Sequence, residues 1–247
     1  MDTEQWQAHR TSFGPAADLY DRIRPTYPAE AIAWMLGTQS LRVVDLGAGT
    51  GKLSRVLRDA GHEVIAVEPD LGMLKRLAET SPGVTPAAGS AEQIPVEPAS
   101  VDAVVAGQAY HWFDVEKAHP EIARVLRPGG IFSPIWNIRD DSESWVGQMS
   151  ELLGSQDGSN HAGNHGLELP AEFGPVERGE FRHGISMDPD ALVTLVKSRS
   201  YYLTATPDRQ AELEAGIRDL CRSHPDLAGR DSFELPYLTV AYKAGRR

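Results

Sequence analysis

Short apolar runs alternate with segments of helical periodicity between Leu41 and Trp136, and this alternation limits the possible fold more than any other feature of the chain. Five runs are expected to be strands, at 41–46, 64–67, 84–88, 101–106 and 131–136. Strands separated by helices at this spacing are typical of right-handed crossovers and of a parallel sheet with helices on both faces. Two more strands, expected at 176–187 and 233–242, would complete a seven-stranded, doubly wound and mostly parallel α/β sheet.

Outside this alternation the composition divides the chain further. Residues 1–36 are expected to form an N-terminal helical segment that covers a binding site, and residues 37–247 the main domain. Residues 137–175 are rich in Ser, Gly, Asn and Asp, which predicts an inserted cap with a short helix and a loop after the fifth strand.

Bulk properties exclude several classes of function. The formal charge of −11 disfavours a general nucleic-acid binder, because phosphate neutralisation requires a basic surface. No run approaches the roughly 20 apolar residues of a membrane helix, and the polar start is unlike a secretory signal. The single cysteine, Cys221, fits a reducing compartment. We therefore expect a cytoplasmic protein, a monomer or homodimer, that binds neither nucleic acid nor membrane.

A glycine loop, Gly47-Ala48-Gly49-Thr50-Gly51, follows the first strand, and three ligand classes use such loops. A phosphate-binding P-loop needs G-x-x-x-x-G-K-[ST], and Leu46 and Leu53 break that pattern. A dinucleotide loop has G-x-G-x-x-G spacing. Here the spacing is shorter and the strand ends in Asp45, which would repel a pyrophosphate.

S-adenosylmethionine (SAM) suits this loop better than either nucleotide class. Its ammonium and sulfonium would be favoured by Asp45, and its carboxylate by the N–H groups of the loop. Glu68 ends the second strand, where a carboxylate is placed to accept hydrogen bonds from both ribose hydroxyls.

Several segments together resemble class I SAM-dependent methyltransferases, and most closely the small-molecule branch called methyltransferase type 11. They are VVDLGAGTGKL, AVEPD, AGSAEQIP, VDAVVAGQAYHWFD and RVLRPGG, and the likeness covers roughly Phe13 to Trp136. The resemblance implies a Rossmann-like fold, SAM as cofactor, S-adenosylhomocysteine as product and a small-molecule methyl acceptor.

The resemblance also implies roles for particular residues. Asp45, Gly47, Ala48 and Gly49 would line the methionine end of SAM, and Glu68 would hold the ribose. Residues expected at the adenine or the sulfonium are Pro69, Met73, Ser90, Ala91, Glu92 and Gln108.

The N-terminal stretch FGPAADLYDRIRPTYP resembles the segment that folds over SAM in this branch. Tyr20 and Arg24 are therefore expected near the SAM carboxylate, and Tyr27 near the acceptor, because an aromatic face suits a sulfonium and a guanidinium suits a carboxylate. A structural helix break with tyrosine in the core is the alternative. Further along, His119-Pro120 interrupts a helical pattern, and we expect a kink or a second helical segment there.

Direct displacement needs a base only when the acceptor must lose a proton. His111 is the candidate for that base, and a packing role beside Trp112 is its alternative. His111, Trp112, Trp136 and Tyr202 are expected to line the acceptor together with Tyr27. No metal is expected, because His161 and His165 lack accompanying acidic or cysteine ligands.

Two other functions remain open at this point. A nucleotide-dependent oxidoreductase is disfavoured by the loop spacing and by Asp45. A non-catalytic SAM-binding module, which would regulate or support a partner, is compatible with an intact loop.

Overall fold

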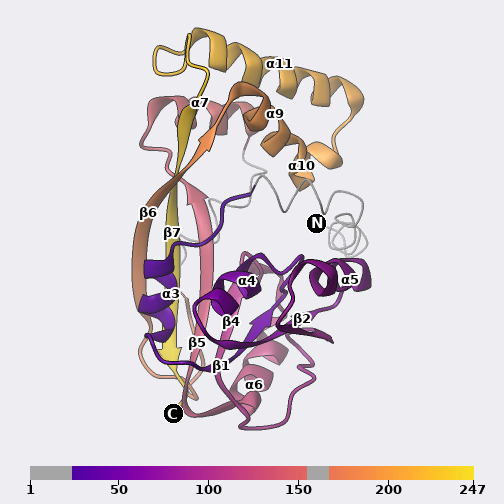
Figure 1. The fold of residues 1–247 in the computed structure, drawn as a ribbon, viewed down its shortest axis with the longest axis vertical. Coiled ribbons are helices and arrows are strands. Elements are labelled where there is room, and N and C mark those ends of the chain that lie inside the picture. Colours follow the sequence, from indigo (N-terminus) through magenta and orange to yellow (C-terminus); the bar gives the residue numbers. More distant parts are fainter. Residues whose placement is uncertain (1–23, 155–166) are drawn as a thin grey trace. The chain divides into compact units, whose positions relative to one another are not determined.

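The computed structural model describes residues 24–154 and 167–247, and it divides into two compact units. Of the described residues, unit 1 contains 24–25, 138–154 and 182–238, and unit 2 contains 26–137, 167–181 and 239–247. Figure 1 shows the described elements. Among them are the strands β1 (Arg42–Leu46), β2 (Glu63–Glu68), β3 (Val84–Ala88), β4 (Val101–Gly107), β5 (Leu126–Arg139), β6 (Glu177–Met187) and β7 (Phe233–Gly245).

These strands form one seven-stranded sheet in the order β3-β2-β1-β4-β5-β7-β6, which confirms the predicted mostly parallel α/β sheet. The pairs β1–β2, β1–β4, β2–β3 and β4–β5 are all parallel. The chain order reverses on the two sides of β1, so the loops after β1 and β4 diverge at their carboxyl ends. In open α/β sheets such a switch point is where ligands bind.

Alternate side chains of the strands in unit 2 belong to two separate apolar clusters. One cluster joins residues such as Val44 and Val104 to α6 (Val115–Val125). The other joins Val43 and Val105 to three helices, α3 (Ala29–Leu36), α4 (Lys52–Asp59) and α5 (Leu71–Thr80). Because strand side chains alternate between faces, these helices cover the two opposite faces of the sheet.

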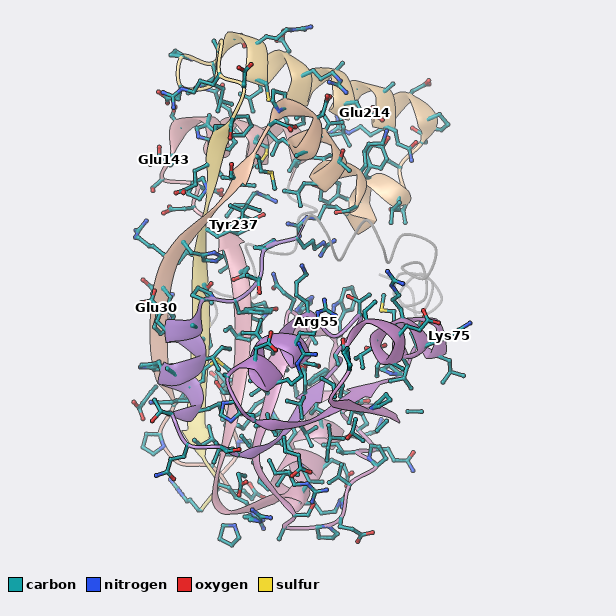
Figure 2. All side chains as sticks on the ribbon, viewed as in Figure 1. Glu30, Arg55, Lys75, Glu143, Glu214 and Tyr237 are labelled. Carbon is teal, nitrogen blue, oxygen red and sulfur yellow. The ribbon has the colours of Figure 1, made fainter. Side chains whose placement is uncertain are left out.

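The core of unit 1 is built mainly from helices and strand ends. Its helices are α7 (Ser144–Leu153), α9 (Pro189–Lys197), α10 (Ser200–Leu203) and α11 (Pro207–Ser223). Fully buried Leu192 and Ile217 pack in one cluster with Tyr237 of β7. Figure 2 labels Tyr237 and also Glu214, to which Tyr202 donates a hydrogen bond.

Two local expectations differ from the structure. One helix, α6, continues through Pro120, so the expected second segment does not begin there, and the alternative of a kink stays a prediction. Buried Ala118 and Ile122 on its inner face outweigh the single hydrogen bond that proline cannot donate. Strand β5 begins at Leu126 rather than at 131, with an irregular register opposite Val101 and Ala103.

Candidate functional site

Asp45 lies at the end of β1 on the face covered by α4, and it is only 1% exposed. The Ser54 hydroxyl donates to Oδ2 at 2.6 Å. The other carboxylate oxygen, Oδ1, is buried and has no hydrogen-bond partner among the described residues. Burial is the main cause that raises the pKa of Asp45 to about 7; the hydrogen bond from Ser54 opposes this shift, and the charge of neighbouring Glu68 adds to it. Asp45 Oδ1 is therefore a buried atom that could accept a hydrogen bond from a ligand.

The loop after β1 is fastened to the end of β2. The Gly47 and Ala48 N–H groups both donate to the Val67 carbonyl, at 2.9 and 3.1 Å. Gly47 has φ +66°, and a Cβ there would lie 2.7 Å from the Cβ of Ala109. Both the backbone conformation and the close approach of the segment after β4 therefore require glycine.

On α4, Arg55 fastens the other end of this loop (Figure 2). Its guanidinium donates to the Thr50 carbonyl at 2.8 Å and to the Ser81 hydroxyl at 3.0 Å. The loop is thus held at both ends, which fixes its N–H groups in direction.

Glu68, at the end of β2, is buried and oriented by backbone N–H groups. Its Oε2 accepts from Gly49 N at 2.8 Å, and its Oε1 accepts from Asp70 N at 2.9 Å. Each carboxylate oxygen can accept more than one hydrogen bond. Asp70 caps α5 by accepting from Met73 N at 2.8 Å, which sets Met73 beside the same loop. A Cβ on Gly49 would lie 3.8 Å from the Met73 sulfur.

The loop after β3 joins this group through two contacts. Gly89 N donates to the Glu68 carbonyl at 3.4 Å. Glu92 Oε1 accepts from Asp114 N at 3.0 Å, which ties the loop to the turn before α6. Ser90 forms a bridge with Gln93, and Ala91 is buried between them.

Gln108, directly after β4, has φ +55°, a conformation that non-glycine residues rarely adopt. Its N–H donates to the Ile135 carbonyl at 2.9 Å, and its side-chain Nε2 donates to the Asn137 carbonyl at 2.9 Å. Asn137 in turn donates to the Thr26 carbonyl at 3.1 Å. Such backbone strain, held by surrounding contacts, is typical of functional sites.

Tyr27 follows Thr26, is buried, and reaches the end of β4. A Cβ on Gly107 would lie 2.7 Å from the Tyr27 hydroxyl oxygen. The absence of a side chain at position 107 is what admits the phenol.

Aromatic side chains gather after β4, around the short 3-10 helix η2 (Tyr110–Trp112). The Trp136 indole Nε1 donates to His111 Nδ1 at 3.4 Å, and the His111 and Trp112 rings have centroids 5.0 Å apart. Tyr110 shares a 2.9 Å hydrogen bond with His119. Desolvation lowers the pKa of His111 to about 4.

Unit 2 thus brings most of the predicted residues to the carboxyl ends of β1, β2, β3 and β4. Two predicted residues lie in unit 1 instead. Arg24 donates to the Ser198 carbonyl at 3.1 Å, and Tyr202 bonds to Glu214. Tyr20, His161 and His165 lie outside the described residues, and Pro69 is exposed at the start of the turn into α5. The roles of all these residues stay predictions.

Two contributors were not anticipated from the sequence, Ser54 and Asn137. Ser54 is fully buried on the apolar side of α4, and a polar residue between Leu53 and Leu57 was a signal that could have identified it. Asn137 had no local signal, because its partners Thr26 and Thr239 are distant in sequence.

Within 24–154 and 167–247, no cluster of three or more His, Cys, Asp or Glu side chains is arranged to hold a metal ion. None of the helices described there is long and apolar enough to span a membrane.

Comparison with known proteins adds independent findings. A family profile described as "Methyltransferase domain" matches residues 44–133. The uncharacterised methyltransferase Rv3342 of Mycobacterium tuberculosis is 42% identical over 233 residues, which cover 94% of this chain and 95% of the relative. The malonyl-[acyl-carrier protein] O-methyltransferase of Pectobacterium atrosepticum is 33% identical over 159 residues, or 62% of each chain.

Among solved structures, a protein from Anaeromyxobacter dehalogenans assigned as a type II methyltransferase superimposes with a TM-score of 0.70. It is 26% identical, and the match covers 90% of this chain and 97% of that one.

Proposed function

Because this chain belongs to the class I SAM-dependent methyltransferases, we propose that it binds SAM in unit 2 and methylates a small-molecule acceptor, releasing S-adenosylhomocysteine. The observation that carries the proposal is the buried Asp45 Oδ1, which has no hydrogen-bond partner among the described residues. A buried acceptor without a donor is costly, and an ammonium donor would remove that cost.

The residues present fit the chemistry of SAM. Asp45 would accept a hydrogen bond from the ammonium, and the N–H groups of the fastened loop would face the carboxylate. Glu68 would accept hydrogen bonds from the ribose hydroxyls while Gly49 and Asp70 hold it in place. Met73 and the segment from Ser90 to Glu92 would border the adenine. SAM, when bound, supplies an electrophilic methyl group on a positively charged sulfur.

The protein's own contribution is alignment and exclusion of water, which suffice for much of the rate of a direct displacement. Gln108 and Tyr27 are held at the end of β4 by contacts on both sides. Rigidity of this kind favours one attack geometry for the acceptor. His111, Trp112 and Trp136 are proposed to line the acceptor.

Three observations support the proposed activity and the proposed class of acceptor. The relatives are named methyltransferases, which favours catalysis over a non-catalytic SAM-binding module. One relative is named a malonyl-[acyl-carrier protein] O-methyltransferase, which supports oxygen as the atom methylated. The strongly acidic charge also disfavours a nucleic-acid acceptor. A cytoplasmic location and a monomeric or homodimeric state remain predictions.

Calorimetric titration of the full chain with SAM, S-adenosylhomocysteine and NAD tests the cofactor directly. We expect micromolar binding of the two adenosyl ligands and none of NAD. Glu68→Ala should weaken SAM binding by about 10-fold or more, through loss of charged hydrogen bonds. Glu63→Ala, at an exposed position at the start of β2, is the matched control and should bind normally. Binding of NAD alone would overturn the proposal.

A further inference from the structure

The hydrogen bond between Trp136 and His111 determines which nitrogen of His111 carries a proton. Trp136 is only 2% exposed, and its indole Nε1 is a donor that has no acceptor capacity. It donates to His111 Nδ1 at 3.4 Å. His111 Nδ1 must therefore present a lone pair, because a buried indole N–H left without a partner is costly.

Two consequences follow for the imidazole. A lone pair on Nδ1 requires the ring to be neutral with its proton on Nε2. Protonating Nδ1 would set two N–H donors against each other. His111 as a whole residue is exposed to solvent. Its pKa is nevertheless lowered to about 4 by desolvation, and this shift favours the same neutral form as the hydrogen bond from Trp136.

The indole that imposes this state is itself held in place. Its ring makes edge contacts with Tyr110 and Tyr242, at centroid distances of 6.1 and 6.0 Å. The Tyr242 hydroxyl accepts from Arg178 Nε at 3.3 Å. All of these residues belong to unit 2, so the arrangement does not depend on unit 1.

We infer that Trp136 is a positioning residue that fixes His111 as a neutral Nε2–H donor rather than a base, and that the acceptor atom it serves is a carboxylate oxygen. The assignment of a carboxylate acceptor rests on the proposed methyltransferase function. A base would need a free lone pair facing the acceptor, and in this geometry the lone pair of His111 faces Trp136. An N–H donor instead suits an acceptor that is already ionised.

A carboxylate meets this requirement because it is ionised at neutral pH. One lone pair of the attacking oxygen forms the O–CH₃ bond, and the C–S bond breaks with its electron pair passing to sulfur. The products are a neutral methyl ester and S-adenosylhomocysteine, and no proton moves. His111 Nε2–H would orient the carboxylate by donating to its second oxygen.

The state of His111 can be measured without any ligand. Long-range ¹H–¹⁵N correlation spectra of the full chain, labelled at histidine, report which ring nitrogen is protonated, and the His111→Gln spectrum identifies the signal. We expect an Nε2–H imidazole that stays neutral from about pH 5.5 upward. Trp136→Phe keeps most of the packing but removes the indole N–H, and it should let His111 titrate at a higher pH. A wild-type His111 that is protonated at Nδ1, or that titrates near its ordinary pKa, would overturn the inference.

Activity separates a donor from a base. Gln carries an N–H donor that reaches the position of Nε2 but cannot accept a proton at neutral pH. The kcat of His111→Gln should therefore exceed the kcat of His111→Ala by about 10-fold or more. If His111 were a base, both variants would lose kcat equally.

A screen of carboxylic acids against the matching primary amines and alcohols tests the acceptor class. Ester formation by the acids alone is expected, and methylation of the amines or alcohols alone would overturn the carboxylate assignment. Absence of SAM binding would refute the proposed function, but the spectra of His111 would still stand on their own.

Discussion

The binding role proposed for Asp45 comes with a cost to the stability of the folded protein. Its carboxyl group is buried among apolar strands, and its pKa rises from 3.8 to about 7 as a result. The folded protein therefore holds an extra proton between these two pH values. By linkage, the free energy of unfolding falls as pH rises from about 4 to about 7, and the loss is complete above that range.

Asp45→Asn should therefore stabilise the protein without ligand at alkaline pH. Asparagine keeps the shape and can still accept the hydrogen bond from Ser54, but it carries no charge to desolvate. We expect differential scanning calorimetry to show a Tm a few degrees above wild type at pH 8, and no difference near pH 4. SAM affinity should fall about 10-fold or more in the same variant. A lower Tm at pH 8 would contradict the assigned pKa direction.

Ser54 lowers the pKa of Asp45 through its 2.6 Å hydrogen bond, so removing the hydroxyl should shift the pH dependence of binding. Ser54→Ala leaves Asp45 protonated to a higher pH. We expect SAM binding several-fold weaker than wild type at pH 7, with most of the loss recovered at pH 9, when both proteins are titrated by calorimetry. An equal loss at both pH values would mean that Ser54 acts only through packing.

At the scale of elements, the site depends on how closely the turn after β1 approaches the segment after β4. Gly47→Ala would set a Cβ 2.7 Å from Ala109 Cβ, in a backbone conformation with φ +66°. We expect a loss of about 1–3 kcal/mol in the free energy of unfolding by urea, together with weaker SAM binding.

Gly37→Ala provides the control for that substitution. Gly37 has φ +76°, but a Cβ there would meet no heavy atom within 4 Å. It should show the conformational cost alone and leave SAM affinity unchanged. Equal effects of the two variants on SAM binding would argue that the close approach at Gly47 is unimportant.

The sequence predicted those elements whose signals are local. The alternation from Leu41 to Trp136 gave the sheet, and the acids that end β1 and β2 proved to flank one loop. The start of β5 was missed because Pro128-Gly129-Gly130 is typical of a turn. In the structure Gly129 N donates to the Arg246 carbonyl, and Arg246 N donates to the Gly130 carbonyl. This pairing joins residues more than a hundred positions apart, so the local sequence pattern at the start of β5 does not predict it.

At the scale of the whole molecule, three strands continue from one compact unit into the other. The boundaries fall within β5 at 137/138, within β6 at 181/182 and within β7 at 238/239. Because the chain is continuous through these strands, we expect the stability of each unit to be linked to that of the other.

Leu192→Ala tests that linkage. Leu192 is fully buried in unit 1, and its truncation should cost about 2–5 kcal/mol. We expect hydrogen exchange to accelerate in β1 of unit 2 as well as in α11. Leu203→Ala, at a partly exposed position of the same unit, should change the exchange rates of β1 and α11 very little. Faster exchange confined to unit 1 would show that the units unfold independently.

The position of β7 also bears on synthesis of the protein. In the sheet β5 lies between β4 and β7, and residues 239–247 return the chain to unit 2 after all of the helices of unit 1 described here have been made. During synthesis on the ribosome, one hydrogen-bonding edge of β5 therefore stays uncovered until β7 is complete. Until then, side chains such as Ile135 lack their final neighbours. An uncovered apolar strand is a template for pairing with other chains. Nascent chains stalled before residue 239 are consequently the species from which aggregation would begin, and the ones on which a chaperone would act.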